Sequence, residues 1–328
     1  MAAGKLLADI ESHLFRAHPE ALEIVLMTKW LVLPLLPGLL GITAGVTANV
    51  AGPAARTQTF FALEREWNAH WPFEIGKPLP KLWERRFEPF VPVWRQVDPH
   101  VTMLLDPYDL VPRTILETGS WERDSWRALA NHLHAGDTFV DIGAHIGYYS
   151  LEAAPLVGPG GRVIAIEPNP ETVRRLRDNI RASGAAGVVS VEPVACSDVE
   201  ATLDLFAAPR SNTGETSLSH TNASQAGLAV ASFRVRARPL DDIIRDSGVA
   251  RVDAIKIDVE GAEYLVLKGA HETLERYHPV ILVELVERQL QAMGTSTAQV
   301  LALLSSHGYT RRHSYDENAE FAVTEPVK

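Results

Sequence analysis

The residues best suited to chemistry form a glycine turn that is followed, about twenty residues later, by a carboxylate. Thr138-Phe-Val-Asp-Ile-Gly-Ala-His-Ile-Gly147 places an acid and two glycines at the end of an apolar run, and Arg162-Val-Ile-Ala-Ile-Glu-Pro168 ends a second apolar run in Glu167. A strand, a glycine turn, a helix and a strand that ends in an acid are typical of a nucleoside-binding βαβ unit. Such an acid can accept hydrogen bonds from both ribose hydroxyls, so the pattern predicts a nucleoside-containing ligand.

The composition of the turn narrows the choice of ligand. A dinucleotide fingerprint needs G-x-G-x-x-G, but Gly143-Ala-His-Ile-Gly147 lacks the middle glycine, and the chain contains no P-loop. Asp141 would repel a pyrophosphate and would suit a cationic ligand. S-adenosylmethionine fits, because it carries a ribose, an ammonium and a sulfonium but no phosphate. The structural alternative is a strand-turn-helix with a surface acid and no ligand.

A second group of acids follows a later apolar segment. Lys256, Asp258 and Glu260 alternate with apolar residues, so the two-residue strand period predicts that all three lie on one face. Charges near the carboxyl end of a strand in an α/β sheet line the ligand crevice. Asp258 is a candidate to hold the cofactor ammonium or to act as the base. Glu260 is a second candidate base, or it stabilises the N-terminus of a helix that begins at Gly261. Lys256 paired with a carboxylate is the structural alternative.

If the ligand is S-adenosylmethionine, methyl transfer from it needs the nucleophile, methyl carbon and sulfur in line, and an acceptor that carries a proton also needs a base. The candidate bases are Asp258, Glu260, Glu284 and His145. Glu284 ends a further strand in the same region, and the imidazole of His145 titrates near neutrality. A hydrogen-bonded loop histidine is an equal interpretation of His145. Asp258, Glu260 and Glu284 could also bind a divalent metal that polarises an acceptor oxygen, which the sequence neither requires nor excludes. No metal ligand is therefore predicted.

The charge is unevenly distributed over the 328 residues, whose net charge is −10. Residues 1–100 contain ten basic and ten acidic side chains, so the whole acidic excess lies in residues 101–328. This argues against a nucleic-acid partner, which would need a basic surface, and favours a small-molecule or glycan acceptor. Cys196 is the single cysteine, and one cysteine suits a reducing cytoplasm. We therefore predict a cytoplasmic location.

Residues 1–100 differ in composition from the rest. Residues 11–29 have helical periodicity, and residues 30–55 contain no charged side chain. The second segment is long enough to span a bilayer, but its prolines and glycines favour a buried or interfacial segment. The alternatives are peripheral membrane contact through a membrane anchor and a true span. Five of the seven tryptophans precede residue 100. Phe60, Phe61, Phe73, Phe87 and Phe90 lie among them. These aromatic residues are interpreted as a layer packed on the main domain, or alternatively as an acceptor cover or an oligomer interface.

From residue 101 onwards, strand and helix signals alternate, which indicates a parallel sheet covered on both faces. The predicted strands are 138–142, 162–167, 188–194, 254–258 and 280–285, and the predicted helices are 148–157, 170–183, 240–247, 261–277 and 296–307. Segments 309–314 and 320–323 predict an antiparallel hairpin. Segments 203–206 and 233–236 predict strands that flank a polar loop. The fold class is therefore α/β, a doubly wound, mostly parallel sheet with a C-terminal antiparallel hairpin. We expect a mainly helical and irregular extension over 1–100 and one domain over 101–328.

Nine motifs in one order resemble the FkbM family of class I S-adenosylmethionine-dependent methyltransferases. They are Gly119-Ser-Trp-Glu122, Asp137-Thr-Phe-Val-Asp-Ile-Gly-Ala-His-Ile-Gly-Tyr-Tyr-Ser150, Ile164-Ala-Ile-Glu-Pro168, Val194-Ala-Cys-Ser-Asp198, Thr213-Gly-Glu-Thr-Ser-Leu218, Pro239-Leu-Asp-Asp242, Ile255-Lys-Ile-Asp-Val-Glu-Gly-Ala-Glu263, Leu267-Lys-Gly-Ala270 and Val283-Glu284. His145 departs from the family, which usually has asparagine there. The resemblance covers most of residues 101–325 and leaves the first hundred unexplained. It implies a Rossmann-like fold and O-methylation of a hydroxyl on a sugar, glycoconjugate or natural product, without fixing the acceptor.

The resemblance and the strand ends together assign the cofactor residues. Asp141 and Gly143 are expected at the methionine end, Ala144 and Gly147 allow close approach, and Glu167 takes the ribose. Ser197 and Asp198 are expected at the adenine edge, and Glu122 either orients the first loop or caps a helix. A methyltransferase-like binding module without catalysis is the alternative function, and the missing middle glycine disfavours a nicotinamide oxidoreductase. The oligomeric state is not predicted.

Overall fold

The computed structural model describes residues 52–70, 89–224 and 231–323. The chain divides into two compact units, Met1–Phe90 and Val91–Lys328, and each is described by itself. The predicted helix over 11–29 and most of the uncharged segment 30–55 lie outside the described residues. In the parts that are described, no helix combines the length and the apolar character needed to cross a bilayer.

The described part of the first unit contains helix α4 (Pro53–His70), which the sequence analysis did not predict. Proline at the first helical position suits this start, because its missing N–H has no helical partner there. Phe60 and Phe61 are each 1% exposed, and their ring centroids lie 5.0 Å apart. The centroid of Phe90 lies 5.0 Å and 5.5 Å from them. Some of the predicted aromatic residues therefore pack together, while the packing of this layer on the main domain stays a prediction.

The second unit is built around a seven-stranded sheet with the order β11-β12-β10-β9-β3-β4-β5. The bounds are β3 (Thr138–Ile142), β4 (Arg162–Ile166), β5 (Val189–Glu192), β9 (Ala254–Ile257), β10 (Val280–Glu284), β11 (Tyr309–Tyr315) and β12 (Asn318–Val323). The five strands from β10 to β5 are parallel, and β12 pairs antiparallel with both β10 and β11. The predicted mostly parallel sheet with a C-terminal antiparallel hairpin is confirmed.

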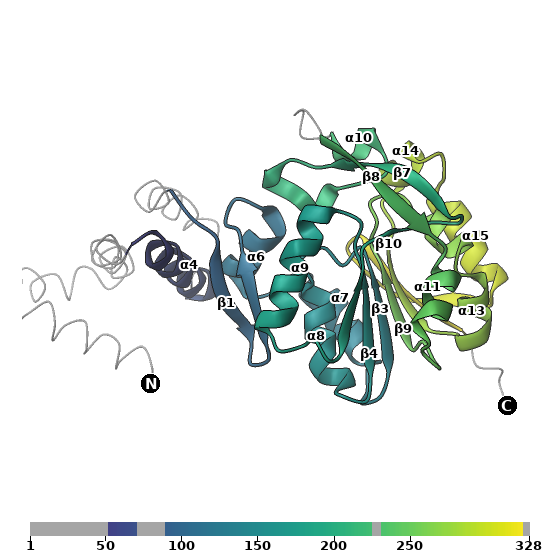
Figure 1. Cartoon of the computed structure of the whole chain (residues 1–328), viewed down its shortest axis with the longest axis horizontal. Helices are drawn as coiled ribbons and strands as arrows, with labels where there is room; N and C mark the ends of the chain where they lie inside the picture. The colour runs from purple at the N-terminus through teal and green to yellow at the C-terminus, as the bar shows by residue number, and fades with distance from the viewer. Residues whose placement is uncertain (1–51, 71–88, 225–230, 324–328) are drawn as a thin grey trace, which may run out of the picture. The chain divides into compact units, whose positions relative to one another are not determined.

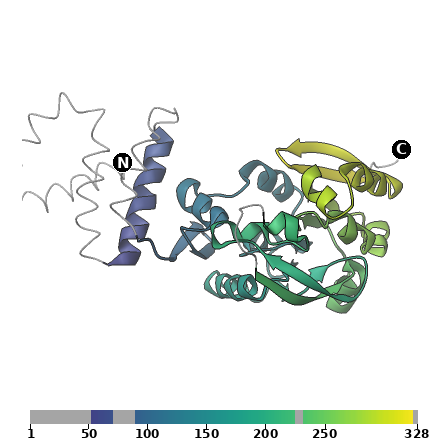
Figure 2. The same cartoon turned by 90° about the horizontal axis from the view of Figure 1, so that it is seen from above.

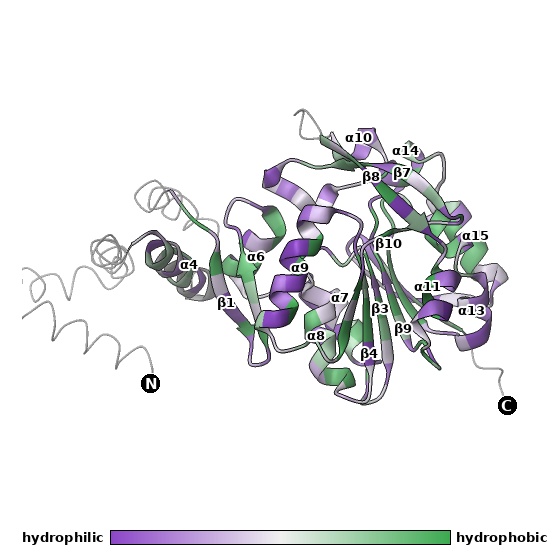
Figure 3. Cartoon of the chain, viewed as in Figure 1, coloured by the Kyte–Doolittle hydropathy of each residue, from purple (hydrophilic) through white to green (hydrophobic). Residues whose placement is uncertain are grey.

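Helices cover both faces of this sheet, as the doubly wound prediction requires (Figure 1). Their bounds are α6 (Leu110–Thr118), α7 (Arg123–Ala130), α8 (Tyr148–Val157), α9 (Pro170–Ala182), α11 (Leu240–Ser247), α12 (Glu263–Lys268), α13 (His271–Tyr277), α14 (Glu287–Ala292) and α15 (Thr297–Ser306). Helices α8 and α9 contact β3, β4 and β5, whereas α11 to α15 supply the core of the opposite face. The central strands are mainly hydrophobic, while α9 and α13 are mainly hydrophilic (Figure 3).

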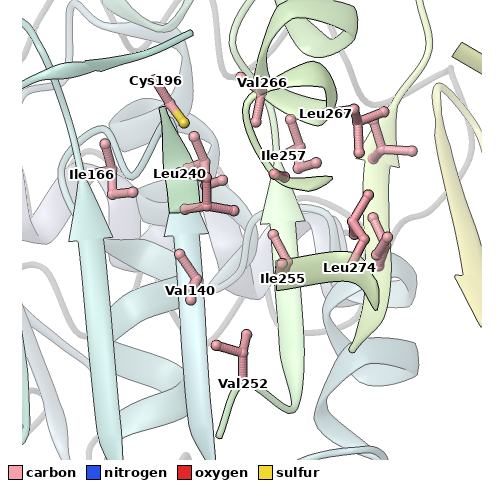
Figure 4. Packing of buried hydrophobic residues seen from close by; sticks show 14 of the residues in the cluster. Val140, Ile166, Cys196, Leu240, Val252, Ile255, Ile257, Val266, Leu267 and Leu274 are labelled. Atoms are coloured by element: carbon pink, nitrogen blue, oxygen red, sulfur yellow. The ribbon is translucent and has the colours of Figure 1, made fainter. Parts of the chain in front are cut away.

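The core shows why these strands form. Val140, Ile255 and Ile257 belong to one buried cluster with Leu240 of α11 and Val266 of α12 (Figure 4). Because side chains alternate along a strand, the same pattern turns the residues between them toward α8 and α9. Each fully buried aliphatic side chain contributes about 1.5–3 kcal/mol of transfer free energy. In a sheet that is buried on both faces, a charged side chain is therefore expected only where a specific partner pairs with it.

Two smaller sheets complete the described part of the unit. Strands β1 (Val93–Asp98) and β2 (Val101–Leu105) form an antiparallel hairpin that is not among the predicted strands, and the predicted domain boundary at residue 100 falls in its turn. Strands β6 (Ala195–Cys196), β7 (Ala201–Ala207) and β8 (Ala231–Arg238) form a separate three-stranded sheet. Between β7 and β8 lie the 3₁₀ segment η2 (Arg210–Glu215) and the short helix α10 (His220–Ala223). Figure 2 shows this green sheet apart from the yellow C-terminal hairpin.

The prediction of one helix over 261–277 was wrong, because α12 ends at Lys268 and α13 begins at His271. Asp241 explains the break. Its backbone N–H donates to the carbonyl of Gly269, and its carboxylate accepts from the N–H of Thr273, so the two groups that would pair in a continuous helix are both occupied. A Cβ at residue 269 would also lie 2.1 Å from the Ser197 carbonyl oxygen.

Candidate active site

A cavity of about 780 Å³ opens at the carboxyl ends of the parallel strands. It lies beside β3, whose two neighbours in the sheet are β4 on one side and β9 on the other. The strand order reverses at this point, which is the usual ligand position in an open α/β sheet. The predicted site residues that line it are Glu122, Asp141, Gly143, Ala144, His145, Glu167, Asp258, Glu260 and Glu284. Gly147, Ser197 and Asp198 do not line it. Most of the predicted residues are therefore brought together around one space.

The two glycines of the first turn serve different contacts. Gly143 has φ +83°, and a Cβ there would lie 1.7 Å from the carbonyl oxygen of Asp258, so only glycine lets this turn approach the end of β9. At Gly147, with φ +93°, a Cβ would lie 2.5 Å from Leu176 Cδ1. Gly147 thus lets the start of α8 pack closely against α9. The sequence predicted a close approach at Gly147, and the structure shows that the neighbour is this helix rather than the cavity.

Glu167 is held in place by the loop it faces. Its two carboxylate oxygens accept the backbone N–H groups of Asn169 and His145, each at 2.9 Å. Burial raises the pKa of Glu167 to about 7, against the lowering effect of these two hydrogen bonds. A carboxylate fixed in this way presents its remaining lone pairs to the cavity it lines.

The buried amine of Lys256 lies among carboxylates. Its Nζ is 2.6 Å from Asp258 Oδ2 and 4.7 Å from the centroid of the Tyr149 ring. Burial alone would lower the pKa of Lys256, but the charges of Asp258, Glu122 and Asp141 outweigh burial and raise it. Asp141 is 1% exposed and accepts the Ser150 hydroxyl at 2.6 Å. The alternative in which Lys256 pairs with a carboxylate is thus confirmed, and Asp258 is engaged in that pair.

Glu122 occupies the N-cap position of α7 with a left-handed backbone, but its side chain makes no capping hydrogen bond. The capping interpretation is therefore wrong. Its carboxylate instead accepts the Tyr149 hydroxyl at 2.8 Å. Burial raises the pKa of Glu122, and burial followed by the charge of Asp258 raises the pKa of Glu284.

Glu260 departs from the predicted alternation. Strand β9 ends at Ile257, and Glu260 lies in the following turn with φ +56°, where its carboxylate accepts the side-chain amide of Gln289. The helix predicted to begin at Gly261 begins at Glu263, and the Glu260 carboxylate faces Gln289 instead of capping it. The Glu263 carboxylate accepts the N–H groups of Val259 and Gly261, each at 3.1 Å, and so fixes the turn that precedes α12.

His145 is joined to a residue pair that the sequence analysis did not assign to the site. Its Nε2 lies 2.7 Å from the Thr213 hydroxyl oxygen. That hydroxyl donates to the fully buried carboxylate of Asp109, which also accepts the Thr213 N–H at 2.9 Å. Since the Thr213 proton points to Asp109, the hydroxyl oxygen accepts from Nε2–H, and Nδ1 keeps its lone pair. Burial lowers the pKa of His145, so the ring is neutral near pH 7.

The Methyltransferase FkbM domain family matches residues 141–311, about half of the chain. The chain belongs to this family. S-adenosylmethionine is accordingly the cofactor of this domain, as predicted. Gly143, Glu167 and Asp141 suit it, because a turn without a side chain, an acid for the ribose and an acid for a cationic group border the same cavity.

Two curated relatives are methyltransferases of small molecules or sugars. The hexuronic acid methyltransferase AglP of Haloferax volcanii is 27% identical over 49% of this chain and 61% of its own length. The 31-O-demethyl-FK506 methyltransferase FkbM of Streptomyces tacrolimicus is 29% identical over 54% of this chain and 74% of its own. Across curated relatives the chain covers from 9% to 75% of the relative's length. The solved FkbM structure from Methylobacillus flagellatus is 16% identical, with a TM-score of 0.40, over 76% of this chain and 71% of that one.

The adenine contacts expected in the FkbM domain need revision. Ser197 is 2% exposed and donates to Asp198, and Asp198 pairs with Lys268, which lowers the pKa of the Asp198 carboxyl. Residues 194–196 line the cavity in their place. The wall beside β5 is thus apolar, which suits the face of a base better than a charged edge contact does.

Several residues of the FkbM domain site escaped the sequence analysis. Asp109, Tyr149, Gln289 and Asn318 contact the predicted acids or His145's partner. Tyr149 lies within a motif that carried the family resemblance, so its proximity to Glu122 was the nearest signal. The others depend on contacts between segments distant in sequence.

Proposed function

We propose that the protein transfers the methyl group of S-adenosylmethionine to a hydroxyl of a sugar, glycoconjugate or natural product. The observation that supports the proposal is one cavity lined by Glu167, Asp141, Asp258 and His145. Three of these are acids that suit a ribose or a cationic group, and the fourth is an imidazole whose pKa is lowered by burial. Methylation of a hydroxyl requires both a bound sulfonium and a proton acceptor beside it.

His145 is the base that the geometry supports best. Its Nε2 is oriented by Thr213 and Asp109, and its Nδ1 lone pair accepts a proton without first having to lose one. Asp258 is a weaker candidate because it is ion-paired with Lys256, and Glu260 because it holds Gln289. The names of two relatives, one acting on a hexuronic acid and one on an oxygen of FK506, support an oxygen acceptor on a polyhydroxylated molecule.

Methyl transfer from labelled S-adenosylmethionine tests the proposal. The full chain is incubated with neutral sugars, hexuronic acids and polyketide alcohols, and methylated products are located by mass spectrometry. We expect transfer to an oxygen of one class, and a His145→Ala variant that binds S-adenosylhomocysteine normally but turns over about a hundredfold more slowly. A folded protein that binds S-adenosylhomocysteine and methylates nothing across these classes would favour a non-catalytic binding module instead.

A further inference from the structure

Three carboxylates from different parts of the chain converge at one side of the cavity. Glu122 precedes α7, Asp258 follows β9 and Glu284 ends β10, and one oxygen from each lies within 4.8 Å of the others. Glu284 is 8% exposed. Negative charges this close and this poorly hydrated repel each other strongly, so the arrangement favours a cation between them. Lys256 supplies only part of the positive charge that the three carboxylates require, because its hydrogen bond goes to Asp258.

Two buried oxygen atoms at this cluster provide independent support. Glu284 Oε2 and Asn318 Oδ1 are buried and receive no hydrogen bond from any residue that the structure describes. Asn318 is 4% exposed, lies opposite Glu284 in the β10–β12 register and lines the same cavity. Its side chain also hydrogen-bonds Glu122. A buried oxygen without a donor is costly unless a ligand completes it.

The chemistry of these donors selects the class of cation. Carboxylate and amide oxygens without nitrogen or sulfur ligands suit hard divalent ions such as Mg²⁺ and Mn²⁺. Neighbouring oxygens of an octahedral Mg²⁺ lie about 3 Å apart and opposite ones about 4.2 Å, from ligand distances of about 2.1 Å. Oxygens within 4.8 Å of one another therefore need only a small movement to share one ion.

We propose that Glu122, Asp258, Glu284 and Asn318 bind a Mg²⁺ or Mn²⁺ ion beside the cofactor. Binding of the ion can be measured without turnover, whereas the catalytic role of the ion rests on the proposed function. There the ion would hold an acceptor oxygen and make its hydroxyl easier to deprotonate. Glu122 replaces Glu260 in the set of acids considered from sequence, because Glu260 turns toward Gln289. The competing occupant of this cluster is the cofactor ammonium.

Mn²⁺ is the probe, titrated into the metal-free full chain and followed by electron paramagnetic resonance. The background is Glu275→Gln, because His271, Glu275 and His307 form a second group that could hold a metal. We expect one saturable site, weakened at least tenfold by Glu284→Gln and by Asn318→Ala. Glu192→Gln, at the end of β5 and outside the cavity, is the matched control and should bind Mn²⁺ unchanged.

Titration with S-adenosylhomocysteine in the same samples separates the two proposals and reports whether each variant is folded. Absence of Mn²⁺ binding by protein that binds S-adenosylhomocysteine would overturn the metal site and leave the methyltransferase proposal intact. Mn²⁺ binding that both variants leave unchanged would overturn the assigned ligands. Mutually exclusive binding of Mn²⁺ and S-adenosylmethionine, with S-adenosylhomocysteine showing the same exclusion, would assign the carboxylates to the ammonium. Mn²⁺ binding without binding of S-adenosylhomocysteine would support the site and count against the proposed function.

Discussion

Cofactor binding should be coupled to the protonation of Glu167. In the free protein burial raises the pKa of this carboxyl to about 7, so it is about 90% protonated at pH 6 and about 10% at pH 8. Two ribose hydroxyls that donate to the carboxylate favour its charged form. Binding should therefore release about 0.9 proton at pH 6 and about 0.1 at pH 8. Affinity rises with pH up to about 7 and then levels off, a gain of about tenfold, or 1.4 kcal/mol, between pH 6 and pH 8.

Isothermal titration with S-adenosylhomocysteine, in buffers of different ionisation enthalpy, measures this proton release. The Glu167→Gln variant should lose the pH dependence and bind roughly tenfold to a hundredfold more weakly at pH 8, since a hydrogen bond to a charged group is worth about 1.5–3 kcal/mol. Glu152→Gln is the matched control, because burial also raises the pKa of Glu152 to about 7 but its side chain lies outside the cavity. Proton release that persists in Glu167→Gln, or that disappears in Glu152→Gln, would refute the reasoning.

Three further substitutions test the framework of the site. Gly143→Ala should lower the free energy of unfolding in urea by about 2–4 kcal/mol, because the new Cβ would combine φ +83° with a 1.7 Å approach to a backbone oxygen. The control is Gly184→Ala, which has φ +66° and open space around the Cβ and should lower it by about 1 kcal/mol. Lys256→Met should cost about 3–5 kcal/mol in the same assay, because it removes the partner of Asp258 and leaves the buried acids uncompensated, and an unchanged unfolding free energy would contradict the pairing. Thr213→Val should lower kcat about tenfold to a hundredfold without changing the Kd of S-adenosylhomocysteine, and unchanged kcat would remove His145 as an oriented base.

The central fold was predictable because its signals are local. Helices over 148–157 and 240–247 have the predicted bounds, since a turn residue precedes each and glycine follows each. The parallel strands are runs of buried aliphatic residues, and their order along the chain left few possible topologies. The β1–β2 hairpin was not predicted, because β1 lies within residues 1–100, which were expected to be mainly helical and irregular.

The site was predictable only where one segment carries all the information. Asp141, Gly143 and Glu167 belong to a short motif whose spacing sets their positions. The contact between Asp109 and Thr213 spans 104 residues, and the pairing of Asn318 with Glu284 depends on an antiparallel register that no local pattern encodes. The strand period placed Glu260 incorrectly because β9 ends at Ile257 and Glu260 lies in the following turn with φ +56°.

Part of the excess of acidic side chains in residues 101–328 lies in the candidate active site. Five acids line one cavity: Glu122, Asp141, Asp258, Glu260 and Glu284. Among the described residues that line it, Lys256 is the buried side chain with a positive charge. Burial of so many carboxylates opposes folding unless they are protonated or meet cations, so a stable protein would not accumulate them for packing alone. The cofactor supplies an ammonium and a sulfonium but also a carboxylate, which leaves the cluster of Glu122, Asp258 and Glu284 short of positive charge. A divalent cation would supply that charge and direct it at an acceptor oxygen.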